Sequence, residues 1–247
     1  SVLDRAEEFA SGRVTIQALR KDIEAGRDIP LLVPDAAAGA AETLLNLATA
    51  LNRSGGESFV RLYLQYATAL QPDSDVILIQ LAGVAEQQGD GEAAIEHYEK
   101  IPASSPMKRI AELQLGLNLA DLKRHDEAIE HLKTALDQDP DDMRAYLALG
   151  GVYSQQENYA AAAELYDRAV GRIDHEDRTH WNIFYQRGIA YERLKQWDKA
   201  EPNFRKALEL YPDQPHVLNY LGYSWVDMNM NLDEGLELIQ RAVDLRP

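Results

Sequence analysis

The sequence predicts an all-α fold assembled from repeated pairs of antiparallel helices. Alanine, leucine, glutamate and glutamine dominate its 247 residues and β-branched runs are few, which favours helices over strands. Glycine or alanine recurs within helical patterns about every 34 residues, a period typical of helical repeat arrays. Proline and Asn or Asp recur at fixed offsets from these small residues, where they end one helix and begin the next.

The recurring small residues set the register of the repeat. In a helical hairpin, a small residue lets the two backbones approach, and a larger side chain fills the remaining space. Gly188 is followed in this way by Ala200, Phe204 and Ala207. We expect these regular residues to build the array rather than to contact a ligand. The anchors are Ala48, Ala82, Gly116, Gly150, Gly188 and Gly222.

This pattern resembles the tetratricopeptide repeat family over residues 41–247. The resemblance implies an all-α, right-handed superhelical solenoid of antiparallel helix pairs. The fourth unit has four extra residues in its terminal loop, and the sixth has one extra residue in its inter-helix turn. Alanine replaces glycine in the first two units, and Val60 and Gly235 replace an alanine of the second helix. The six units are 41–74, 75–108, 109–142, 143–180, 181–214 and 215–247.

Residues 1–40 are expected to form an N-terminal cap or a degenerate repeat. Segments 2–10 and 14–25 have the periodicity of amphipathic helices, and 27–38 contains two prolines and is expected to be a loop. Its apolar residues predict that this loop packs on the first hairpin; they are Ile29, Leu31, Leu32 and Val33.

The ends of the chain bear on its location. The first residue is not methionine and no signal-peptide pattern follows it, so we expect an internal start. No polar capping helix follows Pro247, so we expect the natural chain to continue or a partner to cover this end. Stretch 218–227 resembles one common in bacterial tetratricopeptide proteins, some of them in the cell envelope. It favours the bacterial periplasm or envelope over the cytoplasm.

Charge and hydropathy exclude two classes of partner. The formal net charge of −16 argues against nucleic acid and anionic membrane surfaces. The acidity serves solubility, or it attracts a basic partner. No stretch approaches the run of about 20 apolar residues that a membrane span needs, so we expect no direct insertion of this fragment.

The resemblance also implies a binding surface. In this family the inner surface is lined mainly by the first helix of each pair, here called helix A. Its sixth position is an amide in four units, namely Asn46, Gln80, Gln114 and Gln186. A regular row of amides can bond the backbone of an extended peptide. The alternative is that glutamine is only a soluble helix former.

Apolar and aromatic residues extend this surface. Tyr185, Tyr220 and Tyr223 form the expected hot spot, because tyrosine gives large contact area at low entropic cost. The alternative is that such residues pack between helices. The complete predicted groove comprises Asn46, Ile79, Gln80, Leu113, Gln114, Leu117, Leu147, Gln155, Asn182, Tyr185, Gln186, Ile189, His216, Asn219, Tyr220 and Tyr223.

Catalytic chemistry is not indicated. The sequence has no cysteine, phosphate loop or nucleophile elbow, so we expect no enzymatic activity, no cofactor and no metal. The carboxylates and histidines of 174–180 lie in an exposed loop, which argues against a metal site. His97 and His131 are expected to face solvent. Leu45 and Thr49 stand where chaperone-binding relatives need Lys and Asn.

These observations predict a non-catalytic scaffold that binds a protein or peptide segment in its groove. Two alternatives stay open. One is an accessory subunit of an envelope protease or glycan-processing enzyme, which would use its outer face or the loop 171–180. The other is a self-assembling structural protein, a homo-oligomer that pairs through the ends of its array.

Overall fold

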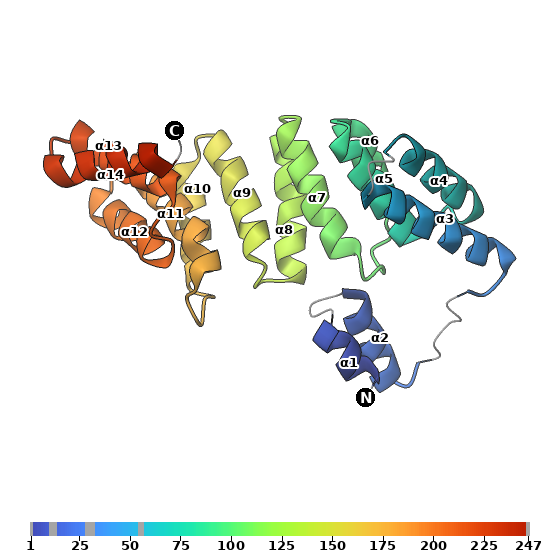
Figure 1. Ribbon diagram of the computed structural model, residues 1–247. Helices are drawn as coiled ribbons and strands as arrows, with labels where there is room; N and C mark the ends of the chain where they lie inside the picture. Colours follow the sequence, from blue (N-terminus) through green and yellow to red (C-terminus); the bar gives the residue numbers. More distant parts are fainter. Residues whose placement is uncertain (1, 10–13, 28–32, 54–56, 246–247) are drawn as a thin grey trace. The chain divides into compact units, whose positions relative to one another are not determined.

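The computed structural model describes residues 2–9, 14–27, 33–53 and 57–245, and these residues form an all-α structure (Figure 1). The described residues contain fourteen α-helices, one short 3-10 helix and no strand. The chain divides into two compact parts, which we treat separately: the N-terminal part, Ser1–Gln138, and the C-terminal part, Asp139–Pro247.

Each part is a series of helices joined by short turns. The N-terminal part contains α1 (Val2–Phe9), α2 (Val14–Glu24), α3 (Ala36–Arg53), α4 (Glu57–Leu70), α5 (Asp75–Gln87), α6 (Gly91–Glu99), α7 (Lys108–Asp121) and α8 (His125–Gln138). The C-terminal part contains α9 (Met143–Gln155), α10 (Tyr159–Val170), the 3-10 helix η1 (Arg178–His180), α11 (Trp181–Arg193), α12 (Trp197–Leu210), α13 (Pro215–Asp227) and α14 (Leu232–Leu245).

The helices pack as consecutive antiparallel pairs, which confirms the predicted fold class. In the N-terminal part α3 pairs with α4, α5 with α6 and α7 with α8; in the C-terminal part α9 pairs with α10, α11 with α12 and α13 with α14. Within each part consecutive pairs also contact each other, as α4 contacts α5 and α12 contacts α13.

A glycine in the first helix opposite a large side chain in the second sets the distance within three pairs. Gly116 faces Leu132, and Gly150 faces the ring of Tyr166. A Cβ at Gly188 would lie 2.7 Å from Cε1 of Phe204. The facing Leu132, Tyr166 and Phe204 side chains are fully buried. The regular glycines are therefore sites of close backbone approach, as the sequence predicted.

The turns inside five of the pairs repeat one backbone geometry. The second residue after the first helix has positive φ; these residues are Gly89, Lys123, Glu157, Lys195 and Asn229. The next N–H donates to the carbonyl five residues earlier at 2.8–2.9 Å, as from Arg124 to Leu119 and from Asn158 to Tyr153. These bonds form the Schellman motif, which satisfies carbonyl groups at a helix end.

Two local features follow from cap chemistry. Helix α3 begins at Ala36, earlier than the expected unit start at residue 41, because Asp35 Oδ1 accepts a 2.8 Å hydrogen bond from Ala38 N and alanines follow. The loop therefore ends before residue 38. Of its apolar residues, Ile29, Leu31 and Leu32 lie outside the described residues, while Val33 contacts Gly39 of α3.

The extra residues of two units occupy loops. In the turn before α14, a second residue with positive φ, Asn231, follows Asn229. In the loop 171–180, Asp177 caps η1 by accepting from the N–H of Thr179 at 2.7 Å.

Helices α1 and α2 lie where helices were expected, and an ion pair of 2.7 Å between Arg20 and Asp4 joins them. Their role as cap or degenerate repeat stays a prediction.

Replacing Gly188 by alanine tests the close approach. We expect Gly188→Ala to lower the free energy of unfolding by about 1–3 kcal/mol, because the new methyl group overlaps the Phe204 ring. The matched control is Gly151→Ala in α9, where a Cβ has no atom within 4 Å. This control should raise stability by about 0.5–1 kcal/mol, because alanine favours helix. Urea unfolding followed by circular dichroism measures both, and equal effects would contradict the close approach.

Candidate functional site

The predicted amides of the N-terminal part lie at or near the surface of successive helix A segments. Asn46 of α3 is exposed, and Gln80 of α5 and Gln114 of α7 are half-buried. Within the described residues, none of these three side-chain amides has a hydrogen-bond partner. Their donors and acceptors are therefore available to another chain. We call these three residues the amide row.

A hollow of about 410 Å³ borders the amide row between α5, α6 and α7. It brings together two predicted residues, Gln114 and the exposed Leu117. Asn118 Nδ2 donates to Glu86 Oε1 at 2.7 Å and so joins α7 to α5. We call it the Gln114 hollow; its lining is Glu86, Gly89, Gly91, Gln114, Leu117, Asn118, Asp121 and Leu122.

Two predicted groove residues of the N-terminal part are less accessible than expected. Leu113 is buried, with 4% of its surface exposed, so it belongs to the core and not to a binding surface. Its neighbour Gln114 remains partly exposed, because adjacent helical residues point about 100° apart. Ile79 is half-buried.

In the C-terminal part, two of the three predicted hot-spot tyrosines pack between helices. The Tyr185 and Tyr220 rings meet edge to face with centroids 5.9 Å apart, and the Phe204 centroid lies 5.2 Å from that of Tyr220. Tyr220 Oη donates to Glu192 Oε2 at 3.1 Å. Burial, followed by the negative charge of Glu192, raises the pKa of the Tyr220 hydroxyl. These contacts join α11 to α13.

Tyr223 is the accessible member of the three, with 66% of its surface exposed. The remaining predicted residues of this part divide in the same way. Leu147, Asn182, Gln186 and Ile189 are half-buried, and Gln155, His216 and Asn219 are exposed. The structure thus brings Tyr185 and Tyr220 together as a seam and leaves Tyr223 at the surface.

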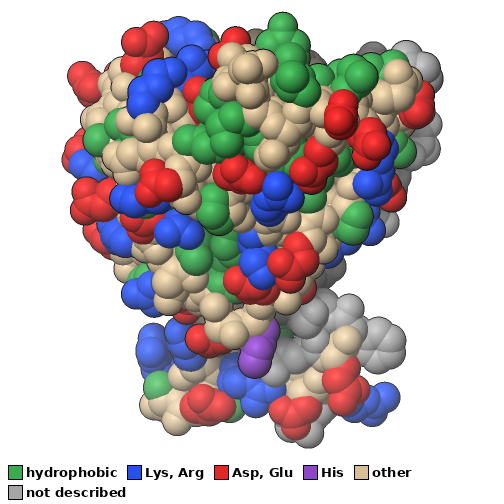
Figure 2. Space-filling view, turned by 90° about the vertical axis from the view of Figure 1, so that its left-hand side faces the viewer, with side chains coloured by type: hydrophobic (Ala, Val, Ile, Leu, Met, Phe, Trp, Pro, Cys, Tyr) green, Lys and Arg blue, Asp and Glu red, His purple; other side chains and the backbone are tan. Residues whose placement is uncertain are grey.

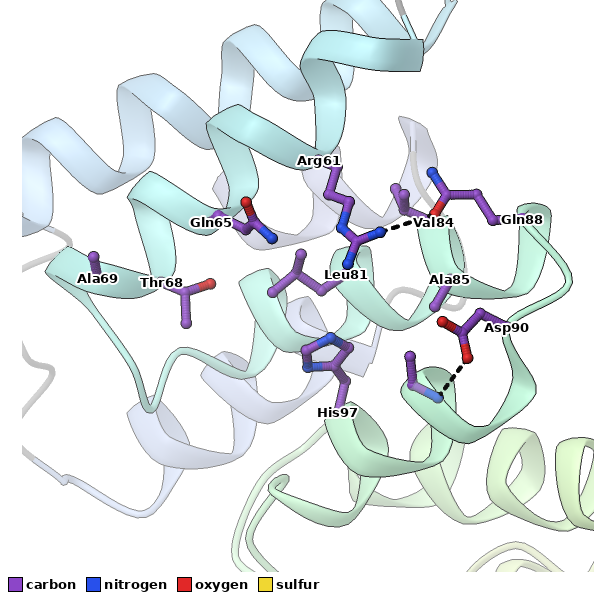
Figure 3. Close-up of a pocket in the computed structure, with 11 residues that line it drawn as sticks. Arg61, Gln65, Thr68, Ala69, Leu81, Val84, Ala85, Gln88, Asp90 and His97 are labelled. Atoms are coloured by element: carbon purple, nitrogen blue, oxygen red, sulfur yellow. Dashed lines mark hydrogen bonds between the residues drawn. The ribbon is translucent and has the colours of Figure 1, made fainter.

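A pocket that the sequence reasoning missed lies between α4, α5 and α6 (Figure 3). Its volume is about 360 Å³, and Arg61, Leu81 and His97 border it from the three helices. The His97 side chain is half-buried, and its buried Nδ1 has no hydrogen-bond partner among the residues that the structure describes. We call it the His97 pocket; its lining is Arg61, Gln65, Thr68, Ala69, Leu81, Val84, Ala85, Gln88, Asp90, Ala93 and His97.

The expectation that His97 and His131 face solvent is therefore wrong. His97 borders the pocket, and His131 Nδ1 lies 2.5 Å from a carboxylate oxygen of buried Glu112. Lys108 pairs with the other oxygen at 2.9 Å. One signal was present in the sequence: Leu81, Val84, Ala85 and Gln88 have helical spacing along one face of α5, and alanines on α4 and α6 leave space beside them.

The histidine-rich loop is held by local capping. Asp177 accepts from Thr179 and lies 3.1 Å from His180 Nδ1, so its carboxylate serves η1. The described residues contain no group of three His, Cys, Asp or Glu side chains placed to hold a metal ion. No helix in the described ranges combines the length and apolar character of a membrane span.

Comparison with known proteins identifies the repeat. Residues 113–177 and 181–214 match two families that are both described as tetratricopeptide repeat. The TPR repeat-containing protein PA4667 of Pseudomonas aeruginosa is 25% identical over 70% of this chain and 29% of its own length. The general transcriptional corepressor ssn6 of Schizosaccharomyces pombe is 30% identical over 55% of this chain and 12% of its own length. The chain thus spans less than a third of either relative.

Solved structures show the same fold. The crystal structure of YrrB, a TPR protein with an unusual peptide-binding site, matches with a TM-score of 0.58 and 18% identity, over 74% of this chain and 96% of YrrB. A crystal structure of MamA matches with a TM-score of 0.59 and 22% identity, over 71% of this chain and 93% of MamA. At these identities the likeness concerns the fold alone.

The partial burial of His97 predicts that the stability of the protein depends on pH. Burial, followed by the charge of Lys100, lowers the pKa of His97 from 6.5; Arg61 acts in the same direction, and Glu96 and Asp90 oppose it. The unfolded chain then binds the proton more tightly, so the neutral ring's contribution is full above pH 6.5 and is lost as the pH falls toward the folded pKa. Urea unfolding at several pH values should show wild type losing more stability than His97→Gln below pH 6.5. Parallel pH profiles would contradict this assignment.

Proposed function

We propose that this chain, in which residues 113–177 and 181–214 match the tetratricopeptide repeat, is a non-catalytic scaffold that binds a polypeptide segment along its helix A surfaces. Repeats of this family mediate protein–protein interactions. The YrrB structure, which shares the fold, is described as having a peptide-binding site. Residues on several successive helices would contribute contacts, so that individually weak contacts add up to one binding surface.

The amide row carries this proposal. Asn46, Gln80 and Gln114 occupy the same position of three successive pairs in the N-terminal part, and their amides are unpaired within the described residues. If glutamine were present only because it favours helix, it would have no reason to recur at one position of successive units. An amide can donate to a peptide carbonyl and accept from a peptide N–H, so the row favours an extended backbone of varied sequence.

The Gln114 hollow favours a segment that carries a lysine or arginine. Glu86 and Asp121 are the ionisable residues of its lining, and Leu117 and Leu122 offer apolar surface for the stem of a long basic side chain. Among the described residues, Asp121 has neither an ion pair nor a side-chain hydrogen bond. The net charge of −16 would steer such a segment toward the protein.

In the C-terminal part, Tyr223 is the side chain that fits the role of a hot spot. Exposed Asn219 precedes it by one helical turn on α13. Tyr185 and Tyr220 contribute indirectly, because they hold α11 and α13 together beneath this surface. A Tyr185 or Tyr220 variant could therefore lose binding because the helices are destabilised. Tyr223→Ala removes only a contact with the bound segment.

Peptide selection tests the proposal. A random peptide library displayed on phage is enriched on the protein, and the affinity of an enriched peptide is measured by fluorescence anisotropy. We expect the double variant Gln80→Ala, Gln114→Ala to weaken binding by about tenfold, since two hydrogen bonds of roughly 0.5–1.5 kcal/mol each are lost. The matched control, Gln17→Ala with Gln138→Ala, replaces exposed amides elsewhere. Equal affinity for all three proteins would refute the role of the amide row.

Self-assembly is a second candidate, favoured by the surface of the last pair. Leu236 and Val243 of α14 are 65% and 53% exposed, and Leu232 lies one turn before Leu236. Figure 2 shows hydrophobic side chains among charged ones on the side where α13 and α14 lie in Figure 1. Light scattering over a concentration series should show association that Leu236→Lys with Val243→Lys abolishes. A monomer at every concentration would exclude this candidate.

We also propose that the protein works in the bacterial cell envelope. The stretch 218–227, which forms most of α13, supports this location through its likeness to envelope proteins. Fractionation of the source cells tests it, because recovery in the cytosolic fraction alone would contradict an envelope location.

A further inference from the structure

The His97 pocket and Gln80 of the amide row lie on different sides of α5. Successive residues of an α-helix are about 100° apart. Leu81, Ala85 and Gln88 therefore share one side of α5 and border the pocket, whereas Gln80 points about 100° and Gly83 about 160° away from Leu81. The pocket lining includes none of the amide-row residues Asn46, Gln80 and Gln114. The pocket is thus a separate site.

The pocket combines an apolar floor with a polar rim. Leu81, Val84 and Ala85 of α5 form the floor. Ala69 of α4 and Ala93 of α6 stand at the edges, and their small size leaves the space open. Its volume of about 360 Å³ falls at the lower end of the range for ligand pockets, so it suits one large side chain.

Arg61 gives the pocket a positive charge at its rim. Figure 3 shows its guanidinium above Leu81 and beside Gln88, whose Oε1 accepts a long hydrogen bond of 3.5 Å from Nη1. Within the described residues Arg61 makes no ion pair, although the chain has 41 acidic and 25 basic residues. Asp90, the acid of the lining, accepts from Ala93 N at 3.1 Å as the cap of α6. The guanidinium thus retains N–H groups for an incoming carboxylate.

The surface beside the pocket extends it beyond the reach of a small molecule. Phe59, Leu62 and Tyr66 lie on neighbouring turns of α4, and 57%, 41% and 55% of their surfaces are exposed. Exposed apolar residues that follow one helix next to a pocket are characteristic of a protein-binding surface. This strip favours a polypeptide as the occupant.

We propose that the His97 pocket binds an acidic protein segment that inserts one large apolar side chain and places a neighbouring carboxylate on Arg61. The apolar side chain covers Leu81, Val84 and Ala85, and adjoining residues of the segment lie on the α4 strip. The protein would then have two interaction surfaces of opposite preference: the Gln114 hollow favours a basic side chain, and the His97 pocket favours an acidic segment.

Three short peptides separate the two parts of this recognition. They are acetyl-Glu-Phe-Glu-amide, acetyl-Gln-Phe-Gln-amide and acetyl-Glu-Ala-Glu-amide, each titrated into the protein while the His97 ring resonances are followed by NMR. We expect the first peptide to shift these resonances saturably, with a dissociation constant on the order of millimolar. The uncharged and the alanine peptides should each bind roughly fivefold or more weakly, since each lacks one of the two contacts.

Two variants and two matched controls locate the binding. Arg61→Gln should weaken the first peptide to the level of the uncharged one, and Ala69→Phe should abolish its effect by filling the pocket. Arg168→Gln and Ala160→Phe make the same changes at exposed positions of α10 and should bind like wild type. Thermal unfolding checks that each variant is folded.

Each contrary result overturns the proposal at a defined point. Equal binding of the uncharged peptide would exclude recognition of the carboxylate, and equal binding of the alanine peptide would exclude insertion of a side chain. An unchanged His97 spectrum with all three peptides would exclude the pocket. Unchanged binding to Ala69→Phe would place the peptide elsewhere.

Discussion

The close approach of two helices at a glycine is the constraint on which the rest of the fold depends. Because Gly188 has no Cβ, the Phe204 ring of α12 can lie directly against the backbone of α11. The same ring also reaches beyond its own pair, with its centroid 5.2 Å from that of Tyr220 in α13. One small residue and one large residue thus set the spacing within a pair and help to dock the next pair. Repeating this arrangement extends the array without a single central core.

Sequence periodicity was sufficient to predict the pairs because their strictest constraint is local. Gly116, Gly150 and Gly188 each face a residue of the adjacent helix, so the sequence spacing alone reports the contact. Surface chemistry depends on more distant relations. Leu113 and Gln114 are adjacent in sequence, yet one is core and the other is partly exposed, and that division depends on the helices packed around α7. The early start of α3 depends on a single cap at Asp35.

The sequence predicted one of the two candidate sites and not the other, and the same contrast between local and distant relations explains this. The amide row occupies the same position of three successive pairs, so the period of the sequence predicts it. The His97 pocket takes residues from three helices of two successive pairs. Its formation requires small side chains at Ala69 and Ala93 at the same time, and neither alanine departs from what an ordinary helix contains. A site of this kind emerges only when the helices are assembled.

The repeated left-handed turn has a consequence for how such an array can evolve. Of the five corresponding residues with positive φ, one is glycine, and the others are Lys123, Glu157, Lys195 and Asn229. A side chain in this conformation costs roughly 1–2 kcal/mol relative to the right-handed region, except where asparagine eases it. Exchanges between glycine and other residues at these positions would adjust the stability of one hairpin at a time. Such exchanges would leave the side chains of the amide row and the His97 pocket unchanged. Selection could therefore act on the stability of the hairpins almost independently of binding.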